Sequence, residues 1–386
     1  MYRRKVVFWS SCTGMLLFGI VLITLGSVIP DLRVKTGMDE VSSGALFSLM
    51  QFGILAGSMI FGPVVDKYSY RILLTLSCAF MSAGFLGIAL AHSEGTLRVY
   101  GFLIGLGGGA VNGATNALVS DISEKDKGAK LSLLGVAFGV GALGMPLILG
   151  ILRDVFSFEV ILVSVAVLTA ATGLLFLVIK FPPPKQPYGF PVARSLAMIK
   201  DGFLLMIAFF LVIQSSFEGI LNNWTTTYLL DYMSVQQSVT LYALSAFVAG
   251  MAVMRIIIGT FLRSWSEKRL LPVSFLLILT GLILMKWGHS IVPAVAGLVM
   301  LGAGLAAGFP VMLALTGTRY TELSGTAFSF ILFIALLGNM TVNYGMGFIA
   351  RSYGISHLTT VAFILLAFMV FLYIFLFKSN KRKNYT

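Results

Sequence analysis

Long apolar runs separated by short polar segments dominate the sequence. A membrane-spanning helix needs about 20 consecutive, mostly apolar residues, and twelve stretches of the chain meet that requirement. We therefore predict an all-α membrane protein with twelve transmembrane helices. The predicted helices cover residues 6–30, 44–65, 71–91, 97–120, 131–152, 160–180, 203–230, 239–262, 270–287, 292–318, 325–350 and 358–377.

The composition supports this reading. Hydrophobic residues make up 58% of the 386 residues and charged residues only 11%, whereas soluble domains contain about 25% charged residues. A water-soluble globule is therefore excluded. Cys12 and Cys78 both lie inside apolar runs and predict neither a disulfide framework nor a metal site. The sequence shows no nucleophile–base pair and no nucleotide-binding loop, so we expect neither an enzyme nor a cofactor.

The basic residues are distributed unevenly along the chain. The formal net charge is +12, which could indicate a nucleic-acid partner, but the positions of the charges follow membrane topology instead. The terminal tails and the even-numbered loops contain 20 Lys and Arg residues, whereas the odd-numbered loops with their helix ends contain six. This bias predicts that both termini are cytoplasmic and that the protein lies in the plasma (cell inner) membrane. The six are Arg33, Lys35, Arg98, Arg153, Lys286 and Arg351.

The two halves of the chain repeat each other. A shift of 197 residues superimposes eight glycines of the first half on eight of the second, for example Gly105 on Gly302. The chain is therefore predicted to be a duplicated six-helix unit whose copies run in parallel. Residues 181–200 contain five prolines and are interpreted as a cytoplasmic linker, because proline is disfavoured inside helices. The predicted domains are residues 1–180 and 201–386.

Residues 62–71, GPVVDKYSYR, look like the loop 2–3 signature of the major facilitator superfamily, although Ser69 replaces its second glycine. A loose second copy runs from Arg255 to Arg269, with Arg263 where the signature has an acid. The resemblance covers nearly the whole chain. It implies two six-helix bundles around a central cavity lined by spans 1, 4, 7 and 10.

The signature also suggests a cytoplasmic gate. Charges at the helix ends could hold the cytoplasmic side shut and separate when it opens. The alternative is that these charges only set topology and contribute little energy. The predicted gating residues are Asp66, Lys67, Arg71, Arg255 and Arg263.

Polar side chains inside the spans predict the binding site, because they are costly in lipid unless they face a cavity or one another. Amides both donate and accept hydrogen bonds and therefore suit hydroxyl-rich solutes, while a tryptophan offers an apolar face to a sugar ring. The predicted substrate-binding residues are Gln51, Asn112, Asn116, Gln214, Glu218, Asn222, Asn223, Trp224, Asn339 and Asn343.

Glu218 is the main candidate for proton coupling. It lies about 24 Å along its span, near mid-depth, whereas Arg255 lies about 12 Å from the cytoplasmic end of the next span, so we expect the two at different levels. The alternative is a hydrogen-bonded structural carboxylate. Asp31, at the mouth of the first span, is the second proton candidate. Residues 106–117 resemble a segment of the fucose–galactose–glucose proton symporters, with Asn112 in place of their acid.

The leading functional hypothesis is a secondary transporter that moves a small polar solute, a sugar or sugar acid, by alternating access coupled to protons. A drug or lipid efflux antiporter of the same fold is the first alternative, because the chain also contains 31 Phe and 18 Met. A non-transporting sensor or membrane enzyme is a remote alternative. The expected partners are a small-molecule substrate, membrane lipid and a proton, with no nucleic acid, and the protein is expected to be a monomer.

Overall fold

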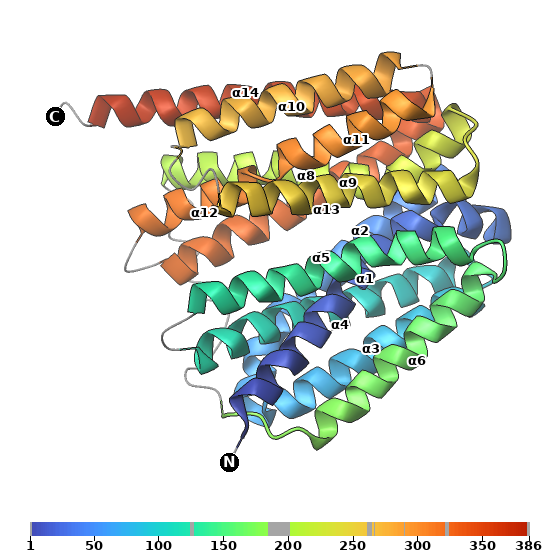
Figure 1. Cartoon of the computed structure of the whole chain (residues 1–386), viewed down its shortest axis with the longest axis vertical. Coiled ribbons are helices and arrows are strands. Elements are labelled where there is room, and N and C mark those ends of the chain that lie inside the picture. The colour runs from blue at the N-terminus through green and yellow to red at the C-terminus, as the bar shows by residue number, and fades with distance from the viewer. Residues whose placement is uncertain are drawn as a thin grey trace. The chain divides into compact units, whose positions relative to one another are not determined.

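A computed structural model describes residues 2–123, 127–183, 201–260, 265, 267–288, 290–320 and 324–383. All regular elements in these ranges are helices (Figure 1). Twelve helical segments are long and apolar enough to cross a membrane, so the prediction of a twelve-span all-α membrane protein is confirmed.

The chain divides into two compact units, residues 1–190 and 191–386. The helices of unit 1 are α1 (Arg4–Thr36), α2 (Glu40–Tyr68), α3 (Tyr70–Leu90), α4 (Glu94–Ile122), α5 (Lys127–Leu152) and α6 (Phe158–Val178). Those of unit 2 are α8 (Gly202–Thr227), which continues as a π-helical turn (Tyr228–Tyr232), α9 (Gln237–Thr260), α10 (Glu267–Trp287), α11 (Ile291–Leu305), α12 (Gly308–Arg319), α13 (Ser324–Tyr353) and α14 (Leu358–Lys383).

Short polar residues mark where several helices begin and end. The carboxylates of Asp39 and Asp201 accept backbone N–H bonds at the starts of α2 and α8, and the hydroxyl of Ser93 does so at the start of α4. These caps satisfy backbone donors that have no partner inside the helix. Gly37 ends α1 with a φ of 70°, a left-handed conformation that glycine adopts without steric cost.

Each unit packs its helices in the same pattern. In unit 1, α4 packs against α2 and α3, α1 packs against α5, and α3 packs against α6. In unit 2, α11 packs against α9 and α10, α8 packs against α13, and α10 packs against α14. These pairs correspond under the 197-residue shift.

The repeated glycines lie where these helices cross. A Cβ on Gly105 would lie 2.1 Å from the backbone oxygen of Met50, and a Cβ on Gly302 would lie 2.0 Å from that of Phe247. Gly302 and Phe247 each lie 197 residues after their counterparts, Gly105 and Met50. The same holds for Gly53 against Phe102 (2.3 Å) and Gly250 against Val299 (2.4 Å). Only a residue without a side chain permits such an approach, and this explains the glycine repeat physically.

The tenth span differs from the prediction. The sequence predicts one helix at residues 292–318, but the structure has two helices, α11 and α12, separated at Ala306 and Ala307. Pro310 lies two residues into α12 and has no N–H, so the regular hydrogen-bond ladder cannot continue through this point. The equivalent helix of unit 1, α4, is continuous from Glu94 to Ile122, with Gly113 at the position that corresponds to Pro310.

Candidate functional site

Buried amides join α8 to α13 in unit 2. Asn223 donates to Asn343 Oδ1 (2.9 Å), Asn343 donates to both Asn339 oxygens, and Asn339 donates to the Ser215 hydroxyl (3.0 Å). All four side chains are buried. Beside them, a Cβ on Gly219 would lie 2.4 Å from Asn339 Oδ1, so the network fills the space between the two helices. We call Ser215, Asn223, Asn339 and Asn343 the amide ladder.

The ladder changes the interpretation of its members. Asn223, Asn339 and Asn343 were predicted to bind substrate, and here they bind one another. A buried hydrogen-bonded network stabilises the interface that contains it, and removing one member leaves the others unsatisfied. In this arrangement these three residues hold α8 and α13 together through hydrogen bonds.

Gln214 stabilises the break between α11 and α12. Its Nε2 donates to the backbone oxygen of Leu305 (2.8 Å), a carbonyl at the last residue of α11. A Cβ on Gly308 would lie 2.3 Å from Gln214 Oε1, so the glycine is needed for the amide to reach the break. Non-helical backbone at membrane depth has to find partners within the protein. Gln214 supplies one of them.

Glu218 and Asn222 differ from these neighbours. Both project from α8 at successive i, i+4 steps, which places them on one side of the helix. Asn222 is 6% exposed and its Oδ1 has no hydrogen-bond partner. Glu218 is half-buried and forms neither a hydrogen bond nor a salt bridge within the described residues. These two side chains therefore retain their binding capacity.

Arg255 is a charged residue that acts on Glu218. The arginine lies on α9 and its charge attracts the Glu218 carboxylate, but at a separation longer than a salt bridge. Counting residues along each helix placed the two at different levels. That expectation stays a prediction, and α8 and α9 pack against each other.

The remaining predicted binding residues have varied surroundings. Asn112 and Asn116 on α4 are half-buried, and Asn116 Nδ2 donates to Asn112 Oδ1 (3.0 Å), so each amide keeps unused capacity. Gln51 on α2 is buried. Trp224 is fully buried, and therefore its ring has no exposed face that could stack on a sugar in this arrangement.

The predicted gating residues can be located only in part. The side chains of Asp66 and Lys67, together with Arg263, lie outside the described residues. Arg71, in the first turn of α3, and Arg255 are both exposed. Their gating role stays a prediction.

The structure reveals a polar cluster that the sequence analysis did not identify. It joins the start of α8 to the end of α12: Tyr320 donates to Asp201 Oδ2 (2.5 Å), and the Arg319 guanidinium lies 4.1 Å from the centre of the Phe203 ring. Burial acts to raise the pKa of Asp201, but hydrogen bonds from Tyr320, Leu204 and Phe203 and the nearby Arg319 charge hold that pKa below its usual range. The sequence indicates this cluster only through the charged and aromatic residues at the two helix ends.

In unit 1, charged side chains gather at the end where α1 terminates. Arg153 forms two hydrogen bonds to Asp31 (2.7 and 3.2 Å), and Lys35 reaches both Glu159 (3.2 Å) and the backbone oxygen of Ala89 (2.7 Å). Because Asp31 is ion-paired, it is a weaker candidate for proton coupling than Glu218.

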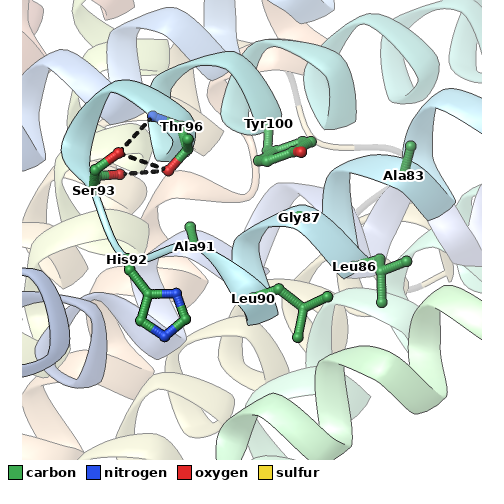
Figure 2. A pocket seen from close by; sticks show the side chains of 9 residues that line it. All are labelled: Ala83, Leu86, Gly87, Leu90, Ala91, His92, Ser93, Thr96 and Tyr100. Atoms are coloured by element: carbon green, nitrogen blue, oxygen red, sulfur yellow. Dashed lines mark hydrogen bonds between the residues drawn. The ribbon is translucent and has the colours of Figure 1, made fainter.

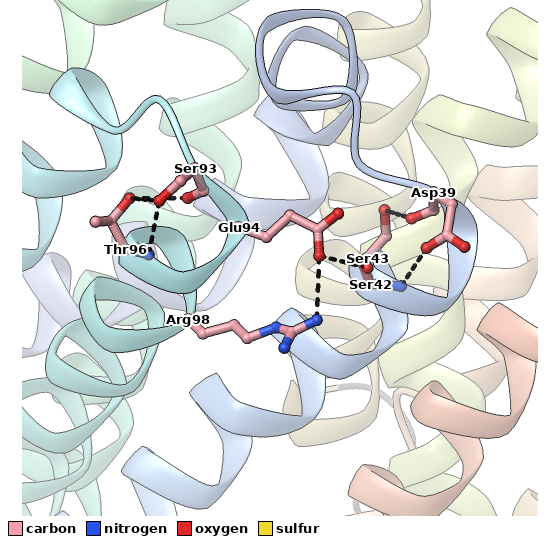
Figure 3. Close-up of polar contacts among 7 residues, drawn as sticks. All are labelled: Asp39, Ser42, Ser43, Ser93, Glu94, Thr96 and Arg98. Atoms are coloured by element: carbon pink, nitrogen blue, oxygen red, sulfur yellow. Dashed lines mark hydrogen bonds and ion pairs between the residues drawn. The ribbon is translucent and has the colours of Figure 1, made fainter.

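The same end of unit 1 contains a second polar group, shown in Figure 3. Glu94 on α4 accepts hydrogen bonds from the Ser42 hydroxyl on α2 (2.7 Å) and from Arg98 (3.2 Å). Arg33 pairs with Glu40 and so joins α1 to α2. Ion pairs therefore connect α1 to α2 and to α6 at this end, and a hydrogen bond connects α2 to α4.

A pocket of about 510 Å³ lies close by, between the end of α3 and the start of α4 (Figure 2). Its lining combines the apolar side chains of Leu86 and Leu90 with His92, Ser93 and Tyr100. Ser93 and Thr96 already bond to each other. None of the residues predicted to bind substrate lines this pocket, and we do not assign the substrate to it.

The comparisons with known proteins identify the family. The model of the Major Facilitator Superfamily matches residues 11–291. The uncharacterized transporter y4wD of Sinorhizobium fredii is 24% identical over 355 residues, which cover 91% of this chain and 93% of that protein. The glucose/mannose transporter GlcP of Bacillus subtilis is 25% identical over 343 residues, or 85% of this chain and 84% of GlcP.

A solved structure gives the same result for the fold. A nucleoside transporter, NupG, superimposes with a TM-score of 0.81 at 16% sequence identity and covers 97% of this chain and 99% of its own. The chain belongs to the Major Facilitator Superfamily. It is a multi-pass membrane transporter of a family whose members carry small molecules and are not enzymes.

Proposed function

We propose that this transporter carries a small hydroxyl-rich solute, a sugar or sugar acid, by alternating access coupled to protons. The observation that carries the proposal is the contrast along α8. Ser215 and Asn223 bond to protein partners, and Gln214 donates to the Leu305 oxygen although its own Oε1 has no partner. Glu218 and Asn222 form no hydrogen bond with a described residue. Unsatisfied polar groups in a membrane span are costly, so a solute that bonds to them recovers part of that cost.

The chemistry of the two side chains matches such a solute. The Asn222 amide offers one acceptor and two donors, and the Glu218 carboxylate accepts from hydroxyl groups. In unit 1, Asn112 and Asn116 provide a second pair of amides with unused capacity. The names of two similar proteins agree with this chemistry, since glucose, mannose and nucleosides all carry several hydroxyl groups.

Glu218 is the residue to which we assign the coupling proton. A carboxylate without a salt bridge in a low-dielectric span can change its protonation state when its surroundings change. Arg255 attracts the ionised form from a distance, and a solute bonded to Glu218 would alter the same balance. Proton binding and solute binding would then be thermodynamically linked.

The remaining elements of the proposal concern orientation and gating. We infer that residues 1–180 and 201–386 form the two bundles, that both termini are cytoplasmic, and that the protein lies in the plasma membrane. The signature residues Asp66, Lys67 and Arg71 close the cytoplasmic side. Within unit 2, the cluster of Asp201, Tyr320 and Arg319 fastens the separate helix α12 to the start of α8.

The test uses Glu218→Gln, which resembles the protonated form. We expect counterflow of the solute in proteoliposomes to survive, while uptake driven by a pH gradient falls at least about tenfold. Asp31→Asn is the matched control, because it removes an acid that is already ion-paired, and its proton-driven uptake should stay within about twofold of the wild type.

Two results would contradict the proposal. Normal proton-driven accumulation by Glu218→Gln would remove the coupling role. Transport of large apolar cations in exchange for protons, with no response to sugars or sugar acids, would favour the efflux alternative. A screen of sugars, sugar acids and drugs by thermal stabilisation of the detergent-purified protein precedes the transport assay, and it identifies the solute.

A further inference from the structure

A groove of about 380 Å³ opens between the end of α10 and the start of α14 in unit 2. The two helices pack side by side (Figure 1). The groove is lined by Lys286, Trp287, Thr360, Phe363, Ile364 and Ala367. One cation and one hydroxyl group therefore lie beside an otherwise apolar surface.

Lys286 is unlike several cations that the sequence analysis grouped with it. Arg33, Lys35, Arg98 and Arg153 each pair with a carboxylate. Lys286 has no carboxylate within salt-bridge distance in the part of the chain that the structure describes. Its Nζ instead lies 5.3 Å from the centre of the Trp287 ring and 5.5 Å from that of Phe363.

The aromatic contacts position the ammonium group without neutralising it. A cation over an aromatic face gains a modest electrostatic attraction, but it keeps its full charge and its three N–H donors. Trp287 and Phe363 also contact each other, with ring centres 5.9 Å apart. The lysine is therefore held at the mouth of the groove and remains able to bind an anion.

The rest of the lining indicates that lipid fills the groove. Trp287 is 57% exposed and Ile364 is 51% exposed, and both lie within predicted membrane spans. Exposed apolar side chains in a membrane span contact hydrocarbon. The Thr360 hydroxyl forms no hydrogen bond with any described residue, although Thr359 next to it donates to the oxygen of Ser356. A donor beside Lys286 is thus available.

The groove is not a consequence of the internal duplication. The positions that correspond to Lys286 and Thr360 in unit 1 hold Ala89 and Val163, so the cation and the hydroxyl group are both missing there. The aromatic pair is missing as well. The full set in unit 1 is Ala89, Leu90, Val163, Ala166, Val167 and Ala170.

We propose that this groove binds an anionic phospholipid from the adjacent leaflet. The lipid phosphate lies against Lys286 and accepts a hydrogen bond from Thr360, and an acyl chain lies along Phe363, Ile364 and Ala367. Cationic side chains at a membrane surface favour anionic lipid, and Trp at this depth suits the interface between headgroup and hydrocarbon. An aqueous anion would gain the charge but would leave the apolar surface uncovered. This site is independent of the solute and the coupling ion.

Native mass spectrometry of the detergent-purified full chain tests the proposal, with phosphatidylglycerol and phosphatidylcholine of identical acyl chains as probes. We expect the wild type to retain phosphatidylglycerol preferentially. Lys286→Gln should weaken phosphatidylglycerol binding about fivefold, which is the effect of roughly 1 kcal/mol per basic residue. It should weaken phosphatidylcholine binding less, because the choline ammonium offsets the charge of the phosphate. Lys286→Arg should preserve the preference. Ala367→Phe, which fills the groove, should weaken binding of both lipids.

The matched control is Arg98→Gln, which removes a cation that already pairs with Glu94 and should leave lipid binding unchanged. An equal preference for phosphatidylglycerol in Lys286→Gln would overturn the proposal. So would displacement of the lipid by millimolar inorganic phosphate, which would indicate an aqueous anion site. Thermal unfolding of each variant verifies that it is folded, and Lys286→Arg serves as the folded reference for the charge.

Discussion

The α1/α5 pair of unit 1 and the α8/α13 pair of unit 2 occupy equivalent places in a duplicated fold, yet their interiors differ. Ser215, Asn223, Asn339 and Asn343 connect α8 to α13 through buried hydrogen bonds. The corresponding unit 1 residues are Phe18, Gly26, Ala142 and Pro146. Glu218 corresponds to Val21 and Asn222 to Leu25. The middle of α1 is apolar where the middle of α8 is polar.

At the end where α1 and α8 terminate, unit 1 is the more polar of the two units. Unit 1 places Asp31, Arg33 and Lys35 there, all in ion pairs, whereas unit 2 has Tyr228, Leu230 and Tyr232 at the same positions. Even so, the link to the neighbouring helix is kept. Lys35 donates to Ala89 O at the end of α3, and Tyr228 donates to Met285 O (3.2 Å) at the end of α10.

This comparison separates two kinds of constraint. Backbone crossings depend on the absence of a side chain, and no other residue type provides that, so Gly53 and Gly105 of unit 1 are matched by Gly250 and Gly302 of unit 2. A polar link between helix ends can be made by a lysine or by a tyrosine. A buried polar interior is costly without function, and it occurs in the unit where we place proton coupling.

The largest expected effect concerns the glycines at the helix crossings that both units contain. Gly105→Val and Gly302→Val should each prevent folding, at a cost of at least about 3 kcal/mol, because the new side chain would overlap a helix backbone. The yield of monodisperse protein in size-exclusion chromatography measures this. Gly139→Val is the control, since a Cβ there has nothing within 4 Å. Normal yield from either crossing variant would show that the two crossings are not equivalent.

The second effect concerns the amide ladder. Asn343→Leu leaves the Asn223 donor buried and unsatisfied, and should destabilise the protein by about 1–3 kcal/mol. Asn116→Leu in unit 1 removes a half-buried amide and should cost less. Adding Asn223→Leu to Asn343→Leu should restore part of the lost stability, because the unsatisfied donor is then gone. Thermal unfolding in detergent measures the stability of these variants. An equal loss of stability in Asn343→Leu and Asn116→Leu would contradict a specific role for the amide ladder.

The third effect concerns the charged end of unit 1. Asp31→Asn breaks the paired hydrogen bonds to Arg153, and because both side chains are largely buried, the expected loss is about 1–2 kcal/mol. Arg98→Gln, at an exposed pair, should lose less than about 1 kcal/mol. If the two variants have the same melting temperature, burial does not distinguish the two ion pairs.

The smallest effect is pH-dependent and lies at the start of α8. The pKa of Asp201 is lowered in the folded state. Its contribution to the stability of the fold is therefore complete above the unfolded pKa of about 3.9, and it is lost as the pH falls through the pKa of the folded state. Tyr320→Phe should therefore cost about 1 kcal/mol at pH 7 and nearly nothing at about pH 2. Melting temperatures at both pH values measure the difference. A difference in melting temperature between the wild type and Tyr320→Phe that grows on acidification would contradict a stabilising hydrogen bond from Tyr320 to ionised Asp201.

Much of the architecture could be predicted from the sequence. Apolar runs of sufficient length specify membrane spans because lipid accepts no unsatisfied backbone, and all twelve spans are present. Glu218 and Asn222 could be identified as unusual, since their chemistry alone is costly in a span. Their distinction from Asn223, Asn339 and Asn343 could not be predicted, because it depends on which side of α8 faces α13.

The helix break shows most clearly what the tertiary structure decided. Prolines occur inside several of the spans. At Pro30, Pro146 and Pro272 the helix continues, whereas the break between α11 and α12 lies beside Pro310. The sequence by itself determined that a proline removes one backbone donor. Where the helix separates, the tertiary structure supplies Gln214 from another helix, which bonds to the Leu305 carbonyl beside Gly308. An exposed carbonyl in a membrane is stable only where the fold brings it a donor.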